Sequence, residues 1–257
     1  MNLKFKWIGG ATCIISFDGI KIAIDPVLCK KGTVQDYFWF KSKRLENPIY
    51  DSNDFKDIHL WLITHNHEDH LDNEGLKVIQ KDAIIISNKN SLKKLQNKQL
   101  KKPIILSHHQ EKKVIIKNYS ITIRAIPAIH GINPLSALFA GKVNGYLITI
   151  QKDKTKKTIY FTSDTVYKKK VICAVANQNI DLLIPNMGAA KQGTWIMTLT
   201  LNAKMLSKMA LQLKPKHILP VHFGTFEHYN EPISETEKYN IQNLSILKVG
   251  EEKDLIL

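Results

Sequence analysis

A short run of polar residues directly after an apolar run constrains this chain more than any other feature. Residues 64–70 read Thr-His-Asn-His-Glu-Asp-His, which places three imidazoles and two carboxylates within residues 65–70. The preceding residues 58–63, Ile-His-Leu-Trp-Leu-Ile, predict a buried strand. Polar groups this dense at the end of a buried strand are costly unless something binds them. The run therefore predicts a metal site.

The spacing inside this run offers ligands to two ions. His65 and His67 are two residues apart, so on an extended turn both side chains can point the same way. Asp69 and His70 follow where the chain bends toward a helix, and we expect them to aim at a second point. Nitrogen and carboxylate ligands suit Zn²⁺, and Mn²⁺ or Fe²⁺ are the alternatives.

Two ions need more ligands than this run supplies. His130, Asp164 and His222 each stand at the carboxyl end of an apolar run that reads as a strand. Polar residues that recur at equivalent strand ends indicate that the fold gathers them with the first cluster. The sequence thus predicts seven metal ligands in four segments.

Strands and helices alternate along the chain without a linker that is rich in Pro, Gly or Ser. A hairpin is expected around Asp18-Gly19, and helices are expected from Asp72 to about Lys81, after Ser91 as a cap, around Val171 and over Met205–Leu213. A last strand is expected over 244–249. Each half opens with strands and then adds helices, which predicts one α+β domain over residues 1–257 with two packed sheets and outer helices.

Residues 27–57 show no clear period and carry several aromatic side chains. A loop this long in a compact domain is usually functional, so we interpret it as a lid or a pocket wall. Packing of the aromatics on the core is one alternative. A contact between subunits is the other, since we expect the protein to form a homo-oligomer.

Composition bounds the partners and the compartment. The formal net charge is +14, from 37 Lys and Arg against 23 Asp and Glu, which favours anionic partners. The lysines are scattered, so we expect an anionic small molecule as substrate, with nucleic acid as the alternative. Three cysteines without a CxxC pair suit a reducing compartment. No apolar run long enough to span a membrane and no secretory signal is found, which predicts a cytoplasmic protein.

The polar segments together resemble the metallo-β-lactamase superfamily of metal-dependent hydrolases. The matching positions are His65-x-His67-x-Asp69-His70, His130, Asp164 in Ser-Asp-Thr, and His222 in Pro-Val-His-Phe, and the resemblance extends from about residue 5 to 227. Gly10-Ala11-Thr12 and Ala128-Ile129-His130-Gly131 make the chain most similar to the ascorbate-phosphate-lactonase-like and phospholipase-D-like branch. Relatives often carry a His where this chain has Gly10, so that group is missing here.

This resemblance implies a four-layer αββα sandwich with the metals at one edge between the sheets. It assigns His65, His67 and His130 to the first ion, Asp69, His70 and His222 to the second, and Asp164 to a bridging position. Thr64, Glu68 and Ser163 are expected to orient ligands or to cap turns. Trp195, Met197 and His228 are expected to contact substrate.

The expected activity is hydrolysis by a metal-bound hydroxide, which attacks an ester, a lactone or a phosphodiester. Asp69 is expected to hold the proton of the nucleophile and to return it to the leaving group. A lactonase or a phosphodiesterase for small molecules is the leading hypothesis. A nuclease that acts on RNA or DNA, or a metal-binding protein without catalysis, are the alternatives.

Overall fold

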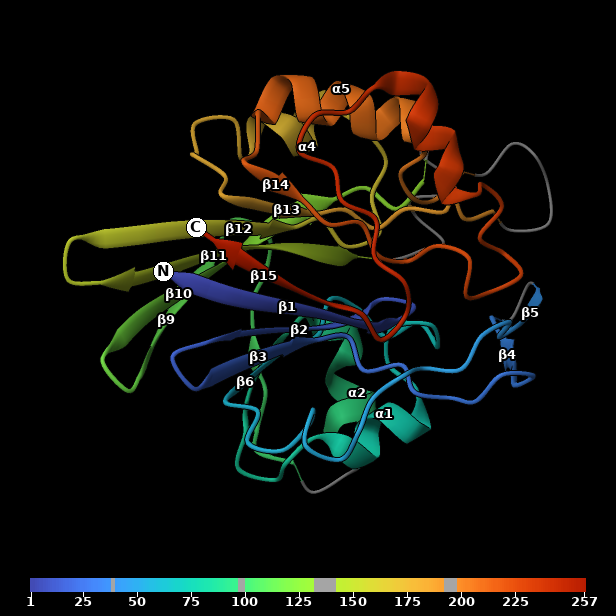
Figure 1. The fold of residues 1–257 in the computed structure, drawn as a ribbon. Helices are drawn as coiled ribbons and strands as arrows, with labels where there is room; N and C mark the ends of the chain where they lie inside the picture. Colours follow the sequence, from blue (N-terminus) through green and yellow to red (C-terminus); the bar gives the residue numbers. More distant parts are fainter. Residues whose placement is uncertain (38–39, 97–99, 132–141, 192–197) are drawn as a thin grey trace. The chain divides into compact units, whose positions relative to one another are not determined.

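The computed structural model describes residues 1–37, 40–96, 100–131, 142–191 and 198–257. The chain divides into two compact units, and each unit is built on one sheet (Figure 1). The first unit comprises Met1–Ile105, Thr225–Glu227 and Leu247–Leu257, and the second comprises Leu106–Gly224 and His228–Ile246. The prediction of one domain over 1–257 with a lid at 27–57 stays a prediction.

The sheet of the first unit has seven strands in the order β15-β1-β2-β3-β6-β7-β8. The first three strands of the chain form an antiparallel meander, and β3, β6, β7 and β8 are parallel. Asp18 and Gly19 take φ values of 42° and 70° in the predicted hairpin turn. The bounds are β1 (Asn2–Gly9), β2 (Thr12–Phe17), β3 (Ile20–Ile24), β6 (Leu60–Leu62), β7 (Ile84–Ser87), β8 (Ile104–Ile105) and β15 (Glu252–Ile256).

Short helices bury their apolar side chains with this sheet. They are α1 (Asn73–Val78), the 3₁₀ helix η1 (Lys89–Ser91) and α2 (Leu92–Gln96). Leu76 of α1 and Leu95 of α2 lie in one hydrophobic cluster with Trp61 and Ile63. The chain from β6 to α1 therefore runs between two anchored elements, and that connection carries the polar run.

The second unit has a six-stranded sheet in the order β14-β13-β12-β11-β10-β9. Since β10 and β12 are both antiparallel to β11, and β12, β13 and β14 are parallel, the carboxyl ends of β10, β12 and β14 lie at one edge. The bounds are β9 (Glu111–Ile116), β10 (Tyr119–Ala128), β11 (Val143–Lys152), β12 (Thr155–Phe161), β13 (Leu182–Ile184) and β14 (His217–Ile218).

The helices of the second unit are α4 (Lys169–Cys173), α5 (Ala203–Leu213) and the 3₁₀ helix η2 (Ile233–Tyr239). Leu206 and Met209 of α5 are buried, as their helical spacing predicts. Arg124 of β10 donates a hydrogen bond of 2.7 Å to the carbonyl of Ala174, which follows α4. No helix within the described ranges has both the length and the apolar character needed to cross a membrane.

One sequence-based expectation about the strands is wrong. The last strand is β15 over Glu252–Ile256, not 244–249, because Leu3 of β1 pairs with Leu255. β15 buries only Leu255 of its five residues, so no apolar run marks it. The aperiodic segment 27–57 also contains a small hairpin, β4 (Val34–Asp36) and β5 (Lys41–Lys43).

Candidate metal centre

The polar run forms an irregular connection, which we call the metal loop and define as residues 64–71. It follows β6 and belongs to no helix or strand. Asp72 ends it as the N-cap of α1, since its carboxylate accepts a hydrogen bond of 2.6 Å from the Gly75 amide. His65, Asp69 and His70 are buried, whereas Asn66 between them is exposed.

A buried carboxylate that the sequence did not identify as a site residue holds the metal loop. Asp25, at the end of β3, accepts hydrogen bonds from the Thr64 amide at 2.8 Å, the Thr64 hydroxyl at 2.6 Å and Nδ1 of His70 at 2.7 Å. Burial raises the pKa of Asp25, and the adjacent His70 and Thr64 oppose that rise. In the sequence, Asp25-Pro26 indicates only the end of a strand.

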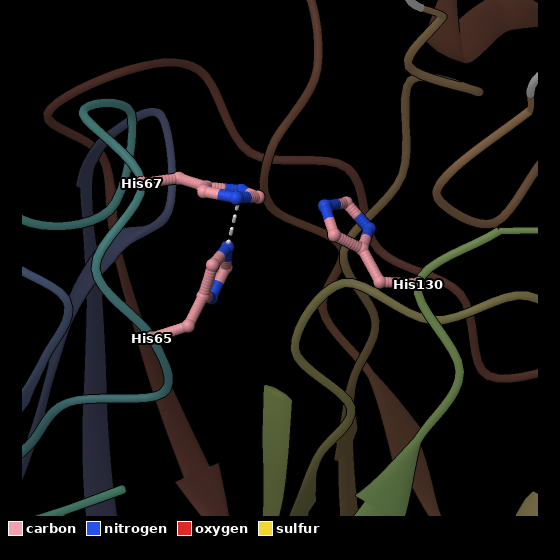
Figure 2. A group of neighbouring side chains, drawn as sticks. All are labelled: His65, His67 and His130. Atoms are coloured by element: carbon pink, nitrogen blue, oxygen red, sulfur yellow. Dashed lines mark hydrogen bonds between the residues drawn. The ribbon is translucent and has the colours of Figure 1, made fainter. Parts of the chain in front are cut away.

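The same hydroxyl fixes the orientation of a second imidazole. Thr64 Oγ1 lies 2.9 Å from Nδ1 of His65. Because this hydroxyl donates its proton to Asp25, it accepts from Nδ1 of His65, and the Nε2 lone pair of His65 faces the other way. That Nε2 lies 3.0 Å from Nδ1 of His67, and Figure 2 marks this contact with a dashed line.

In the second unit, three side chains gather at the strand edge described above. We call His130, Asp164 and His222 the strand-end ligands; they follow β10, β12 and β14. Nε2 of His130 lies 3.7 Å from one carboxylate oxygen of Asp164, and Nε2 of His222 lies 3.4 Å from the other. All three side chains are buried, and Figure 2 labels His130 just beyond its strand.

Backbone carbonyls fix which nitrogen of each strand-end histidine carries the proton. Nδ1 of His130 lies 3.1 Å from the Leu199 carbonyl, and Nδ1 of His222 lies 3.2 Å from the Met187 carbonyl. A carbonyl only accepts, so Nδ1 is protonated and Nε2 carries the lone pair. Two lone pairs thus face the carboxylate of Asp164, an arrangement that a cation between them would stabilise and that fits a metal site.

Asn186 is a further residue of this edge that the sequence did not identify. Its amide donates a hydrogen bond of 2.8 Å to the Asp164 carboxylate, and the Asn186 side chain is fully buried. The carbonyl oxygen of the same amide has no hydrogen-bond partner within the described parts of the chain. Asn186 stands in a loop after β13, where an asparagine usually indicates only a turn.

The hairpin β4–β5 and the residue after β4 contact the metal loop. The Gln35 amide donates a hydrogen bond of 2.8 Å to the Glu68 carbonyl, and the Tyr37 hydroxyl donates one of 2.6 Å to Gln35. The Tyr37 ring lies edge-on to His67, with ring centroids 6.3 Å apart. Burial, followed by the nearby Asp69 carboxylate, raises the pKa of Tyr37.

The remaining residues proposed from the sequence for ligand orientation or substrate contact are Ser163, His228, Trp195 and Met197. Ser163 is buried at a φ of 54°, and its hydroxyl has no partner among the described residues. His228 is buried, with its ring 4.6 Å from that of Tyr229. Trp195 and Met197 lie outside the residues that the structure describes.

Comparison with known proteins gives the family. The family model "Beta-lactamase superfamily domain" matches residues 21–223. This is more than half of the chain, so the chain belongs to the beta-lactamase superfamily. A UPF0173 metal-dependent hydrolase of Koribacter versatilis is 26% identical over an alignment of 268 positions, which covers 97% of each protein. An N-acyl-phosphatidylethanolamine-hydrolyzing phospholipase D of Caenorhabditis elegans is 30% identical over 78 residues, 30% of this chain and 21% of that protein.

Solved structures give the same fold. A possible metal-dependent hydrolase from Veillonella parvula has a TM-score of 0.83 at 21% identity and covers 98% of this chain and 99% of its own. An isothiocyanate hydrolase from Delia radicum gut bacteria has a TM-score of 0.78 at 19% identity, and the match covers 97% of this chain and 98% of that protein. The predicted family and the α+β, metallo-β-lactamase-like fold class are confirmed. The predicted enzyme class, a metal-dependent hydrolase, agrees with the names of the full-length relatives.

Proposed function

We propose that this metal-dependent hydrolase of the beta-lactamase superfamily works with two metal ions. The ligands are the side chains of the metal loop and the strand-end ligands: His65, His67 and His130 for the first ion, Asp69, His70 and His222 for the second, with Asp164 bridging. The nitrogen-rich donor set suits Zn²⁺, and Mn²⁺ or Fe²⁺ are the alternatives.

The orientation of the imidazoles carries this proposal. Four of the five histidines have Nδ1 within 2.7–3.2 Å of an oxygen: His65, His70, His130 and His222. An oxygen acceptor at Nδ1 fixes the tautomer and directs the Nε2 lone pair away from that acceptor. Histidines that bind metal ions are held in this way in proteins generally.

The residues around the centre have separate roles in the proposed reaction. When bound, the two ions lower the pKa of a water molecule and polarise the oxygen of the bond to be hydrolysed. Asp69 holds a proton on its carboxylate and returns it to the leaving group. Asp25 and Asn186 act as positioning residues, because they hold His70 and Asp164 without being ligands.

The proposed substrate is an anionic small molecule with an ester, lactone or phosphodiester bond. The net charge of +14 favours anions at the surface. Similar proteins are named for an isothiocyanate and for an N-acyl-phosphatidylethanolamine, so the bond that is cleaved depends on the pocket walls rather than on the fold. Tyr37 and His228 are the wall residues that we propose from the described part of the chain.

Metal analysis joined to a substrate screen tests the proposal. The purified chain should hold about two transition-metal ions and hydrolyse bis(p-nitrophenyl) phosphate or a simple lactone, with RNA as a third arm of the screen. His67→Ala should reduce this hydrolysis to background. His109→Asn, at an exposed turn histidine, should leave it unchanged. A wild-type chain that binds no metal at neutral pH would contradict the proposal.

A further inference from the structure

The metal loop has backbone groups that no helix or strand can pair. Its carbonyls at Thr64, Asn66 and Leu71 all accept hydrogen bonds from side chains that lie outside the loop. Backbone polar groups that leave water need such partners, so the partners decide whether the loop keeps one conformation.

One side chain supplies two of these bonds and also pairs with a carboxylate of the loop. Nζ of Lys94 lies 3.1 Å from the Asn66 carbonyl, 2.6 Å from the Leu71 carbonyl and 2.6 Å from a carboxylate oxygen of Glu68. A lysine ammonium has three N–H donors, and here three acceptors of one loop surround it. We call this arrangement the Lys94 clamp.

The acceptors of the Lys94 clamp alternate with the proposed ligands. Asn66 stands between His65 and His67, and Glu68 stands between His67 and Asp69. Asn66 is exposed and Glu68 is half-buried, whereas Asp69 is buried. Lys94 thus binds residues that stand between the proposed ligands, through the backbone carbonyl of Asn66 and the carboxylate of Glu68.

The helix that carries Lys94 is itself fixed to the loop. Leu95 is fully buried in the core of the first unit. Asn88 caps η1, directly before α2, by accepting a hydrogen bond of 3.1 Å from the Ser91 amide, and its amide donates one of 2.7 Å to the Thr64 carbonyl. Lys94 therefore projects from an anchored base.

We propose that Lys94 is a positioning residue that holds the metal loop in the conformation that binds metal, an inference that rests on the proposed function. A single ammonium joins the Asn66 and Leu71 carbonyls, so His67, Asp69 and His70 between them, and His65 next to Asn66, stay close to the geometry of the bound state. The ion pair with Glu68 compensates the lysine charge close to a centre that receives cations.

Zinc affinity separates this role from a general contribution to stability. Lys94→Met should lower the affinity for Zn²⁺, measured by competition with a chromophoric chelator, by about 10- to 100-fold. The melting temperature of the metal-free protein should stay close to that of Lys93→Met, a matched control at an exposed lysine on the same helix. Lys93→Met should bind Zn²⁺ like the wild type.

A second variant tests the geometry of the clamp. Glu68→Gln removes the ion pair and leaves the two carbonyl bonds of Lys94, so it should lower Zn²⁺ affinity less than Lys94→Met does. Wild-type affinity in Lys94→Met would overturn the inference, as would equal losses in both variants. If the wild type binds no Zn²⁺, the proposed function fails instead.

Discussion

Side chains that are not ligands determine how the proposed ligands point. Asp25 holds Thr64 and His70 through three hydrogen bonds, and Asn186 holds Asp164 through one. Each partner is buried, so a lost hydrogen bond is not replaced by bulk water. The affinity of the centre for metal should therefore be sensitive to residues that never touch an ion.

Asn186→Leu tests this sensitivity in the second unit. Leucine has the same number and branching of non-hydrogen side-chain atoms as asparagine but cannot donate to Asp164, so the carboxylate loses one of its partners. We expect Zn²⁺ affinity to fall about tenfold. The free energy of unfolding of the metal-free protein, measured in urea, should fall by about 1–3 kcal/mol because a buried acceptor loses its donor.

Asn144→Leu is the matched control for this variant. Asn144 is also a buried asparagine of the second unit, but its amide donates to the Leu106 carbonyl at 2.9 Å. It should destabilise the protein by a similar amount and leave Zn²⁺ affinity unchanged. Equal zinc affinities for the two variants would show that Asn186 has no special role.

The sequence predicts the proposed ligands better than it predicts the residues that hold them. An imidazole or a carboxylate at a strand end is conspicuous because it is costly there. Asp25 and Asn186 also stand at strand ends, but each resembles a turn former, and its partner is distant in sequence. Asp25 lies 45 residues from His70, and Asn186 lies 22 residues from Asp164. A local sequence pattern therefore cannot predict that Asp25 contacts His70 or that Asn186 contacts Asp164.

At the scale of elements, one carboxylate connects α1 to the preceding chain. Asp72 accepts from the Gly75 amide as the N-cap, and its second oxygen accepts from the amides of Leu28 and Cys29 at 3.0 and 2.7 Å. Asn202, the N-cap of α5, accepts from the Met205 amide at 2.7 Å. Asp72 thus joins its helix to the segment at 28–29, whereas the side-chain bond of Asn202 stays within its own helix.

Asp72→Ala should therefore destabilise the protein more than Asn202→Ala. Loss of an ordinary N-cap costs about 0.5–2 kcal/mol, which we expect for Asn202→Ala. Asp72→Ala also loses two charge-assisted hydrogen bonds, so we expect about 3 kcal/mol or more. Urea unfolding of the metal-free variants measures both losses. A smaller loss for Asp72→Ala than for Asn202→Ala would refute this account of the loop junction.

Capping residues show where element prediction succeeds and where it fails. The predicted N-cap Asp72 is confirmed, although α1 ends at Val78 rather than at about Lys81. Ser91 does not cap the next helix, because Asn88 begins a 3₁₀ turn three residues earlier and Ser91 lies inside it. The start of a helix is predictable when the sequence offers one candidate N-cap. Where it offers two, as at Asn88 and Ser91, a tertiary contact decides which one caps the helix, here the hydrogen bond from Asn88 to the Thr64 carbonyl.

At the scale of the whole molecule, the seven proposed ligands belong to both compact units. Four lie in the first unit and three lie in the second, up to His222 in the sequence. Sequence reasoning predicts the α+β fold class because strands and helices have local periods. The strand-end pattern predicts which residues the fold gathers, whereas the assignment of each proposed ligand to one ion depends on long-range topology and came from the family resemblance.

If the proposed centre forms, Zn²⁺ should stabilise both units together. Ligand binding at about 100 times Kd adds about 2.7 kcal/mol to the free energy of unfolding, which for a chain of this size raises Tm by about 5–10 °C over the metal-free protein. Hydrogen exchange should show slower exchange with Zn²⁺ in β6 of the first unit and in β12 of the second. His222→Ala changes only the second unit, yet it should reduce the protection of β6, whereas His109→Asn should not. Protection confined to one unit would mean that the metal loop and the strand-end ligands bind ions independently, so that the bridging position of Asp164 would have to be abandoned.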